Sequence, residues 1–565
     1  MNRPNRRKVL KCGGRDTAFG QPKDTEQATA LSIRDVIPKR CPSKAFGVGT
    51  ALQDASAQTA ALIIALLVLA NTAAIAQTII WTGHDATNSV NSNWSDSANW
   101  TGGTPGSVTN IYFYDSGANN SQGVVNNIVD SNTRILSLNY GNTNGFHTMQ
   151  INSGVTLTVS NNAASVLFFD GTGNENGASQ IVYSTLTGPG SFSVAGTNSG
   201  SEFIIQQGSG TNGSHMATLD MSGLANFSTR VGRMLIGGNG SSSGNMNHPS
   251  GTIYLAGTNT IRVNGAAPAI DVGDAPSNGG TENVYLGKTN AIFADSITIA
   301  RQKCTANMLF NPSMAGNAIL YLNGNTNSRV STLAVGDFSA QSVSASVVFG
   351  TVNLTGGTAI AQVDTCYVAE GQTGSGSGPT TGVLDVGPGQ FNVNTLNVGY
   401  VNSASAAGSI TGAVSVTNGT LVINDELLLA YNAGAPAATS GTLAITNGTV
   451  LANSIIAGGG TSAVNLNGGL LVVSNMMGSS GTPLSAFSFD GGGTLQFAVA
   501  NNFTNAAVGK ITSDNTGVIS ISAMPIVLAY PSEYPLINCP GGGASGVKLV
   551  LGALAGGYQG YISND

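Results

Sequence analysis

The chain reads VTNGTLV at residues 416–422 and ITNGTVL at residues 445–451, so nearly the same phrase returns after 29 positions. Self-similarity at a fixed period is the signature of repeat architectures, in which each repeat is one supersecondary unit. Three further segments show the same order of a glycine turn, an apolar segment, a polar pair and a second apolar segment. The aligned glycines are Gly357, Gly389, Gly419, Gly448 and Gly469, spaced 32, 30, 29 and 21 residues apart.

Weaker copies occur earlier, at 251–263, 283–300 and 318–337. The apolar segments are short, rich in Val, Ile, Leu and Thr, and alternate with a period of two, which is typical of β-strands. A third short segment precedes most turns, as GTLAI does at 441–445. The pattern predicts an all-β fold, namely a parallel β-helix with about three short strands per coil. Gly419 should then lie above Gly448 at about 5 Å.

The turns of successive repeats carry asparagine at Asn418, Asn447 and Asn467. Asparagine tolerates left-handed backbone, so Asn-Gly makes a good turn. Stacked asparagines can also form ladders in which side-chain amides bond between coils. Both interpretations stay open at the level of sequence. In either one an isolated coil would not fold, because its aliphatic side chains are buried only when neighbouring coils cover them.

Charge is scarce and unevenly distributed. Only 8% of the residues are charged and 77 of 565 are glycine, against roughly 25% and about 7% in ordinary soluble proteins. Residues 1–58 hold 11 Lys and Arg against five acids, whereas residues 77–565 hold 10 basic and 22 acidic side chains, so the net charges are +6 and −12. The acidic repeat region argues against a nucleic-acid partner, and a basic nucleic-acid tail is the disfavoured alternative for 1–58.

An apolar run separates these two parts. Ala60–Ala70, followed by the small residues of Ala74-Ile75-Ala76, is typical of a secretory signal cleaved before Gln77. The alternative is an uncleaved anchor. We expect a basic, disordered extension at 1–58, the signal core and cleavage site at 59–76, and no stable membrane span after cleavage. A secreted or outer cell-surface location follows.

Cysteine usage does not indicate a disulfide scaffold. Cys12 and Cys41 fall in the part that is expected to be removed, so Cys304, Cys366 and Cys539 could form at most one bridge. Cys304 and Cys366 are 62 residues apart, about two coils. Even if aligned they would lie roughly 10 Å apart at ~4.8 Å per coil, which is too far for a disulfide.

All three tryptophans lie in WTGHDATNSVNSNWSDSANWTGGTPGS at 81–107. This order of W-x-G, NW and NW-x-x-G-x-P resembles the N-terminal segment of bacterial secreted proteins with autotransporter-associated β-strand repeats. The repeated NGT segments, FSFDGGGTLQF at 487–497 and YPLINCPGG at 534–542 resemble the same group. The resemblance covers nearly everything after residue 77. It implies a right-handed parallel β-helix outside the cell, acting as an adhesin-like or structural passenger.

This organisation divides the exported chain into three parts. We expect a Trp-rich cap at 77–110, parallel β-helix repeats at 111–500 and a C-terminal β segment at 501–565. In similar proteins a last strand follows a phrase like the final GYQGYISND, so we expect the sequence to be truncated at Asp565.

Histidines give little evidence of chemistry. His84, His147, His215 and His248 are scattered and never stand at ligand spacing. His215 and His248 are 33 residues apart, about one coil, so they could stack as a metal or catalytic pair. We favour the interpretation that they are solvated turn residues.

Acids offer a second set of candidates, because polysaccharide lyases and hydrolases need clustered carboxylates with a basic residue. VGD recurs at 272–274 and 335–337, two coils apart, so Asp271, Asp274 and Asp337 could line one flank. Two coils separate carboxylates by roughly 10 Å, so we favour aspartates that end strands in turns. The remaining candidates are Asp425 and Glu426, and the bases Arg262, Lys288, Arg301, Lys303 and Arg329. Acidic turns also offer oxygen ligands to calcium, but GNENG at 173–177 is a lone loop, so we assign no calcium site there.

We therefore assign no catalytic, cofactor-binding or metal-binding residue, and no cofactor. The sequence favours a non-enzymatic secreted or cell-surface β-solenoid, adhesin-like or structural in an extracellular matrix, with extracellular or cell-surface polysaccharide as its partner. The alternative is a polysaccharide-binding or polysaccharide-cleaving β-helix of lyase or hydrolase type. A groove with two carboxylates and a base within about 6 Å would favour the enzyme. A uniform Asn, Thr and Ser surface would favour the structural protein.

Overall fold

The repeat that opens the sequence forms successive coils of a solenoid, as predicted. In the computed structural model Thr420 lies in register with Thr449, and the amide of Thr449 donates to the carbonyl of Gly419 at 2.9 Å. The amide of Leu470 donates in the same way to the carbonyl of Gly448 at 2.9 Å. The glycine turns of neighbouring repeats therefore stack on one another.

The structure describes residues 76–83, 91–142, 144–160, 166–167, 180–196, 200–205, 215–237, 249–275, 280–339, 347–371, 378–435, 437–499, 505–514, 516–540 and 546–563. The expected extension at 1–58 and the signal core at 59–75 lie outside these residues, as do the acidic loop at 173–177, His84 and His248.

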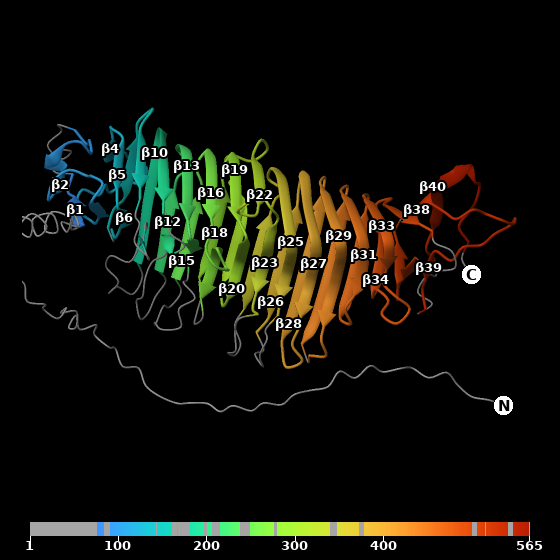
Figure 1. Ribbon diagram of the computed structural model, residues 1–565. Helices are drawn as coiled ribbons and strands as arrows, with labels where there is room; N and C mark the ends of the chain where they lie inside the picture. Colours follow the sequence, from blue (N-terminus) through green and yellow to red (C-terminus); the bar gives the residue numbers. More distant parts are fainter. Residues whose placement is uncertain are drawn as a thin grey trace, which may run out of the picture. The chain divides into compact units, whose positions relative to one another are not determined.

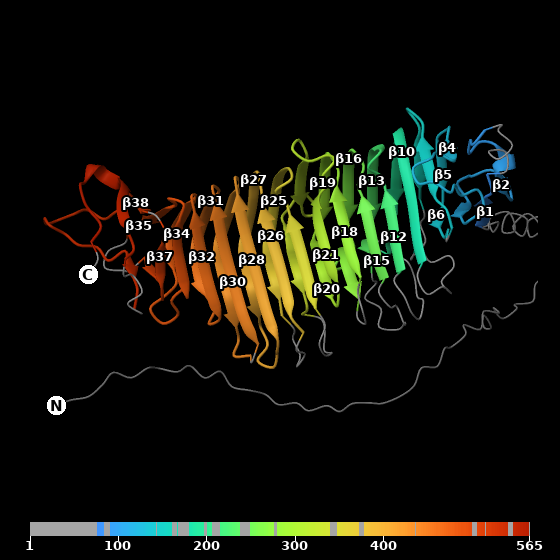
Figure 2. The same ribbon diagram turned by 180° about the vertical axis from the view of Figure 1, so that it is seen from behind.

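Each coil contributes a strand to each of three parallel sheets. A representative coil consists of β15 (Pro249–Tyr254), β16 (Thr258–Val263) and β17 (Ile270–Ala275), which pair in parallel with β18 (Thr281–Leu286), β19 (Thr289–Ala294) and β20 (Ser296–Gln302) of the next coil. The coils follow one another along a single elongated stack (Figures 1 and 2). This arrangement confirms the predicted parallel β-helix with about three short strands per coil.

We name the three stacks sheet 1, sheet 2 and sheet 3 in the order in which the chain enters them. Besides β15 and β18, sheet 1 contains β4 (Asn127–Val129), β7 (His147–Ile151), the first part of β10 (Gln180–Ala195), β12 (His215–Asp220), β21 (Thr305–Phe310), β24 (Val348–Asn353), β26 (Thr380–Val386), β28 (Ser409–Thr417), β30 (Ala438–Thr446), β32 (Thr461–Asn467), β34 (Ala486–Asp490) and β37 (Ile511–Ser513).

Sheet 2 contains β16 and β19 together with β5 (Thr133–Ile135), β8 (Thr156–Val159), the second part of β10, β13 (Leu224–Val231), β22 (Ile319–Asn323), β35 (Thr494–Ala498), β38 (Gly517–Ala523) and β40 (Leu549–Leu554). Sheet 3 contains β17 and β20 together with β9 (Val166–Leu167), β11 (Ser201–Ile205), β14 (Arg233–Ile236), β23 (Val330–Asp337), β36 (Ala506–Ala507) and β39 (Ile537–Asn538). In five coils one bent strand serves both sheets: β25 (Thr358–Glu370), β27 (Gly389–Val401), β29 (Thr420–Asn432), β31 (Thr449–Ala457) and β33 (Leu470–Met477).

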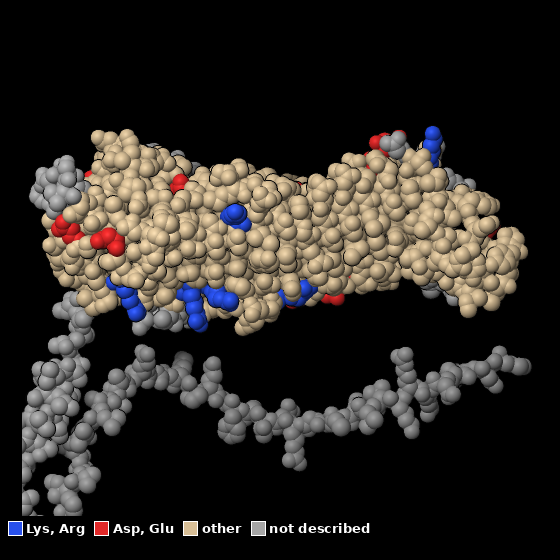
Figure 3. Space-filling model, turned by 90° about the horizontal axis from the view of Figure 1, so that it is seen from above, with Lys and Arg blue, Asp and Glu red and all other residues tan. Residues whose placement is uncertain are grey.

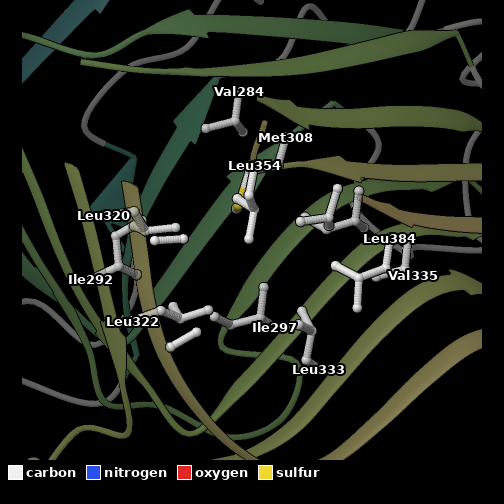
Figure 4. Close-up of a cluster of buried hydrophobic side chains, with 14 of the residues drawn as sticks. Val284, Ile292, Ile297, Met308, Leu320, Leu322, Leu333, Val335, Leu354 and Leu384 are labelled. Atoms are coloured by element: carbon white, nitrogen blue, oxygen red, sulfur yellow. The ribbon is translucent and has the colours of Figure 1, made fainter. Parts of the chain in front are cut away.

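The period-two alternation places one side chain of every pair inside the solenoid. Val284 of sheet 1, Ile292 of sheet 2 and Ile297 of sheet 3 are all buried and point into the same interior (Figure 4). In the next coil they are in register with Met308, Leu322 and Leu333, which are also buried. Each such aliphatic side chain contributes roughly 1.5–3 kcal/mol when it is fully buried. A coil is thus stable only between two others.

The tryptophans of the expected cap pack together at the N-terminal end of the solenoid. Trp100 meets Trp81 and Trp94 edge to face, with ring centroids 4.9 and 5.1 Å apart. The indole N–H of Trp94 donates to Asn127 Oδ1 at 3.1 Å, so the cap is also hydrogen-bonded to β4 of the solenoid. A small sheet of β1 (Gln77–Trp81), β2 (Trp100–Thr101), β3 (Thr109–Phe113) and β6 (Ser137–Tyr140), and the short 3₁₀ helix η1 (Ser97–Asn99), complete this end.

Two details of the predicted register need correction. Gly389 lies in register with Ala359 and not with Gly357, so the alignment of that repeat is wrong by two residues. Asn467 is also not equivalent to the other two turn asparagines, since it pairs with Thr446 and the left-handed position after it belongs to Gly468, with φ 72°. In both places the strand that precedes the turn sets the register, because its aliphatic residues must face inward.

The other two asparagines support the turn interpretation. Asn418 and Asn447 hold left-handed backbone, with φ of 58° and 55°. Ladders of asparagine amides do occur, but at other residues. At the start of sheet 2, Asn259 Nδ2 donates to Asn290 Oδ1 of the next coil at 2.9 Å. A second ladder lies at the corner between sheets 2 and 3. There Asn424 Nδ2 donates to Asn394 Oδ1 at 2.8 Å, and Asn394 Nδ2 donates to Asp364 Oδ1 at 2.6 Å.

Cys304, Cys366 and Cys539 are free thiols, in agreement with the predicted separation of the first two. Both Cys304 and Cys366 are buried in the core.

Candidate functional site

The end of each sheet 3 strand places one side chain of every coil in a single column. The chain turns there through a left-handed residue, which is Gly273, Ala300, Gly336, Ala369, Gly399 or Ala430 in successive coils. The residue that follows lies in register with its counterpart in the next coil. This column reads Asp274, Arg301, Asp337, Glu370, Tyr400 and Tyr431.

Two of the aspartates singled out in the sequence are joined through the arginine between them. Arg301 Nη1 lies 3.2 Å from Asp274 Oδ2, and Arg301 Nε lies 3.7 Å from Asp337 Oδ2. The VGD repeats are indeed two coils apart, as expected, and the intervening coil supplies Arg301. The separation that argued against a cluster is therefore bridged by a cation.

A second arginine joins the cluster one coil earlier. Arg233 Nη2 lies 2.9 Å from Asp271 Oδ2 and 4.0 Å from Asp274 Oδ2, and its Nη1 lies 3.9 Å from Glu202 Oε1. These residues, together with Arg301, Asp337 and Glu370, form what we call the acid–arginine ladder. Asp271 and Asp274 are 0% and 1% exposed, and the two arginines are only partly exposed.

A third buried acid lies directly inside the ladder. Glu282, at the start of β18, faces inward in a column that continues as Ala306, Gly350, Gly382, Gly412 and Gly441. Its glycines pack against the left-handed turns of sheet 3, so a Cβ on any of them would collide with backbone atoms. Glu282 fits only because the two turns against it are Gly237 and Gly273, where a Cβ would collide with its side chain. Cys304 Sγ lies at the same place and donates to the carbonyl of Gly273 at 2.9 Å.

Burial dominates the electrostatics of the cluster. It raises the pKa of Asp271 to about 8, with Asp274 adding to the rise and Arg233 opposing it. Burial also raises the pKa of Asp274 against the opposing effect of Arg301 and of a hydrogen bond from Asp271. The pKa of Glu282 is raised well above its ordinary value, again by burial. Burial thus favours the protonated form of Asp271.

Glu370 is the half-buried member at the far end of the ladder. Burial, with a contribution from the neighbouring Asp337, raises the pKa of Glu370 to about 8. Tyr367 and Tyr400 lie beside it, and their pKa values are raised by burial first and by Glu370 in addition. Glu370 is thus a neutral acid at neutral pH with an aspartate on the adjacent coil.

The ladder is an interior network more than an open active site. A general acid or base must come within hydrogen-bond reach of its substrate, and Asp271, Asp274 and Glu282 are enclosed by protein. Neutral acids also reduce the free-energy penalty of burying several carboxyl groups beside only two arginines. Among the described residues no group of three His, Cys, Asp or Glu side chains is placed to hold a metal ion.

The remaining candidates from the sequence lie elsewhere. His147 is buried and its Nε2 lies 2.6 Å from the carbonyl of Tyr114; burial lowers its pKa to about 4, so it is not a solvated turn residue. His215 pairs through its backbone with Pro249, next to the undescribed His248. Asp425 and Glu426 lie at the corner between sheets 2 and 3, where Asp425 is exposed and Glu426 is half-buried.

Of the five expected bases, only Arg301 forms an ion pair with an acid in the described part of the chain. Arg262 lies over the ring of Phe293, 3.8 Å from its centroid, and Arg329 donates to Asn394 at 2.8 Å. Sequence reasoning missed Arg233, Glu282 and Glu370. A sequence signal for Glu370 does exist. VAE at 368–370 has the same pattern as VGD at 272–274 and 335–337: an aliphatic residue, then Gly or Ala, then a polar residue.

No family model, curated protein or solved structure matches this chain. The fold itself places the protein in the class of parallel β-solenoids. None of the helices formed by the described residues has the length and apolar character of a membrane span.

Proposed function

We propose that this chain is a non-enzymatic, secreted or cell-surface β-solenoid, adhesin-like or structural in an extracellular matrix, which binds extracellular polysaccharide through the outer face of sheet 1. The proposal includes membership of the secreted proteins with autotransporter-associated β-strand repeats, on the motifs described above. Its main support is a regular column of hydroxyl side chains. In register from coil to coil, this hydroxyl column reads Thr281, Thr305, Phe349, Thr381, Thr411, Ser440 and Thr461.

Except at Phe349, the hydroxyl column supplies one donor and acceptor group per coil, at the ~4.8 Å spacing of paired strands. A second column beside it contains Thr252, Asn283, Asn307 and Thr351, and Asn307 Nδ2 donates to Asn283 Oδ1 at 3.0 Å. Charged side chains are few over most of the surface seen in Figure 3. A hydroxyl-rich and regular face suits a long polymer that offers hydroxyl groups at regular intervals better than a small charged ligand.

The half-buried tyrosines Tyr254 and Tyr285 of sheet 1 do not form a sugar-stacking platform. The rings of Tyr254 and Tyr285 stack on each other with centroids 4.4 Å apart and an interplanar angle of 6°. Their faces therefore cover one another along the solenoid, and only ring edges and hydroxyl groups point outward. Binding by this surface would rest on hydrogen bonds.

The test compares binding and cleavage in one experiment. The chain is incubated with pectin, alginate and related polymers, and both its retention on the polymer and the release of shorter products are measured. We expect retention without products, and a loss of retention in the Thr381→Val/Thr411→Val variant. The matched control, Thr420→Val/Thr449→Val on sheet 2, should bind like the wild type. Equal binding by both variants would contradict the proposed face.

A second candidate function, polysaccharide cleavage, is supported by the pair of Asp337 and Glu370. Their Cα positions are in register on adjacent coils, and retaining glycosidases hold their two carboxyl groups about 5–5.5 Å apart. Glu370, with its pKa raised to about 8, would be the general acid, and Asp337, 3.7 Å from Arg301 Nε, would be the nucleophile. Product release that is abolished in both Glu370→Gln and Asp337→Asn would replace our first proposal by this one.

A further inference from the structure

Basic side chains are unevenly distributed among the strands of the solenoid. The strands of sheet 1 contain no Lys or Arg, whereas the strands of sheet 2 from β5 to β22 contain Arg134, Arg230 and Arg262. These same strands of sheet 2 contain no Asp or Glu. In Figure 3 most of the Lys and Arg side chains accordingly lie in a row along one long edge. Positive charge is thus gathered on one flank, although the chain from residue 77 carries a net charge of −12.

Two of these arginines lie directly beside each other. Arg230 on β13 is in register with Arg262 on β16, at the ~4.8 Å spacing of paired strands. Both side chains are on the outer face, because the residues on either side of them are buried. Arg230 is exposed and Arg262 is half-buried. Like charges on adjacent strands repel each other, so an anion bound between the two side chains would relieve this repulsion.

No acid in the described part of the chain relieves it. All ion pairs there that include an arginine belong to Arg233 or Arg301. Arg262 Nη1 donates to the carbonyl of Asn325 at 3.3 Å, and the guanidinium lies over Phe293 of the next coil. These contacts orient Arg262 along the solenoid and leave its charge without a counterion. An oriented guanidinium is the preferred partner of planar anionic groups such as carboxylate.

Two further arginines extend the row in both directions. Arg134 on β5 lies three coils before Arg230 and is exposed, with its Nη2 donating to Ser160 Oγ at 2.8 Å. Arg329 follows β22, two coils after Arg262, and is half-buried. We call Arg134, Arg230, Arg262 and Arg329 the arginine row. From β5 to β22 there are six steps between coils, or about 30 Å along the solenoid.

A column of hydroxyl side chains runs beside the arginine row. In register with Arg134, it reads Thr158, Ser193, Ser228 and Thr260. Ser228 and Thr260 are exposed and stand two residues before the paired arginines, so they share the outer face with them. The flank therefore offers cationic donors and neutral hydroxyl groups side by side. Such a surface suits a polymer that carries both anionic groups and hydroxyl groups.

We propose that the outer face of sheet 2 from β5 to β22 binds a linear acidic polysaccharide, whose carboxylate or sulfate groups contact the arginine row. Nucleic acid fits this face less well. Arg262 already covers the ring of Phe293 at 3.8 Å, so that ring cannot stack on a base. A duplex with one charge per ~1.7 Å would also be repelled by the net charge of −12. This site is separate from the hydroxyl column of sheet 1 and does not depend on it.

The test uses one polymer backbone with and without charge. The full chain is passed over immobilised dextran, carboxymethyl dextran and dextran sulfate, and the dissociation constant is measured for each at several salt concentrations. Both charged derivatives should bind more tightly than dextran at low salt. That difference should disappear as salt is added, because contacts between exposed charges are screened.

Variants locate the binding of the charged derivatives. Arg230→Gln/Arg262→Gln should weaken it about tenfold at low salt, and Arg230→Gln alone, which changes only an exposed side chain, about threefold. The matched control, Lys510→Gln/Lys548→Gln, removes two exposed positive charges elsewhere and should bind like the wild type. The Thr381→Val/Thr411→Val variant of sheet 1 should keep the salt-sensitive difference, which separates a failure of this site from a failure of the sheet 1 face.

Three results would overturn the inference. The first is equal binding of charged and uncharged dextran at low salt. The second is a loss of binding in the lysine control as large as in the arginine variant, because net charge alone would then explain it. The third is tighter binding of double-stranded DNA than of dextran sulfate, which would replace polysaccharide by nucleic acid as the ligand.

Discussion

The glycine column inside sheet 1 makes a specific prediction for Gly382. A Cβ added there would lie closer than 3.0 Å to the amide nitrogen of Ala369, the carbonyl oxygen of Val335 and the carbonyl carbon of Val368. All three are backbone atoms of neighbouring coils, so none can rotate out of the way as a side chain can. The Gly382→Ala variant must therefore push coils apart.

The size of the effect follows from these contacts. Overpacking a well-packed interior typically costs about 1–3 kcal/mol, and three simultaneous backbone collisions place Gly382→Ala at about 3 kcal/mol. Alanine in a strand recovers about 0.5–1 kcal/mol relative to glycine. The net loss in local stability should be about 2 kcal/mol.

Native-state hydrogen exchange of the β26 amides measures this loss, because coils of a solenoid open locally. The matched control is Gly481→Ala, where no atom lies within 4 Å of the added Cβ and φ is not left-handed. It should be neutral or stabilising by about 0.4–1 kcal/mol. If Gly382→Ala keeps the exchange protection of Gly481→Ala, the packing argument is wrong.

Three more outcomes are expected. In the folded chain the pKa of Asp271 is raised from 3.8 to about 8, so between these values the folded state binds more protons than the unfolded state. The melting temperature should therefore fall as pH rises from about 4 through 8. The Asp271→Asn variant should show a weaker dependence of melting temperature on pH. Buried Cys304 and Cys366 should react with a thiol reagent only after unfolding, whereas half-buried Cys539 should react in the folded protein. Trp100→Ala should cost about 3–5 kcal/mol and expose the first coils to limited proteolysis, while coils from β12 onward stay resistant.

The two VGD aspartates show what the spacing of a motif in the sequence can predict and what it cannot. VGD at 272–274 and at 335–337 indicated residues two coils apart, and the register agrees. The spacing did not show that Arg301 lies between them, because adjacent coils differ in length: Asp274 and Arg301 are 27 residues apart, but Arg301 and Asp337 are 36 apart. Unequal loops hide a column that strand pairing makes regular.

Burial of the acids was also invisible in the sequence. Asp271 looks like an ordinary strand residue, and Glu282 like a polar start to a strand. Their environment depends on Arg233, Gly237 and Gly273, which come from other coils. A pKa raised by burial is a property of all these neighbours together, so no local pattern could have indicated it.

By itself the sequence determined the class of fold, since alternation with a period of two, glycine turns and a recurring phrase are local properties that act within one coil. It also determined the scarcity of charge and of paired cysteines. Only the tertiary structure decided the register at Gly389 and the acid–arginine ladder. Both depend on which residues of adjacent coils lie in register. That register is fixed by the aliphatic side chains, which must face the interior of the solenoid.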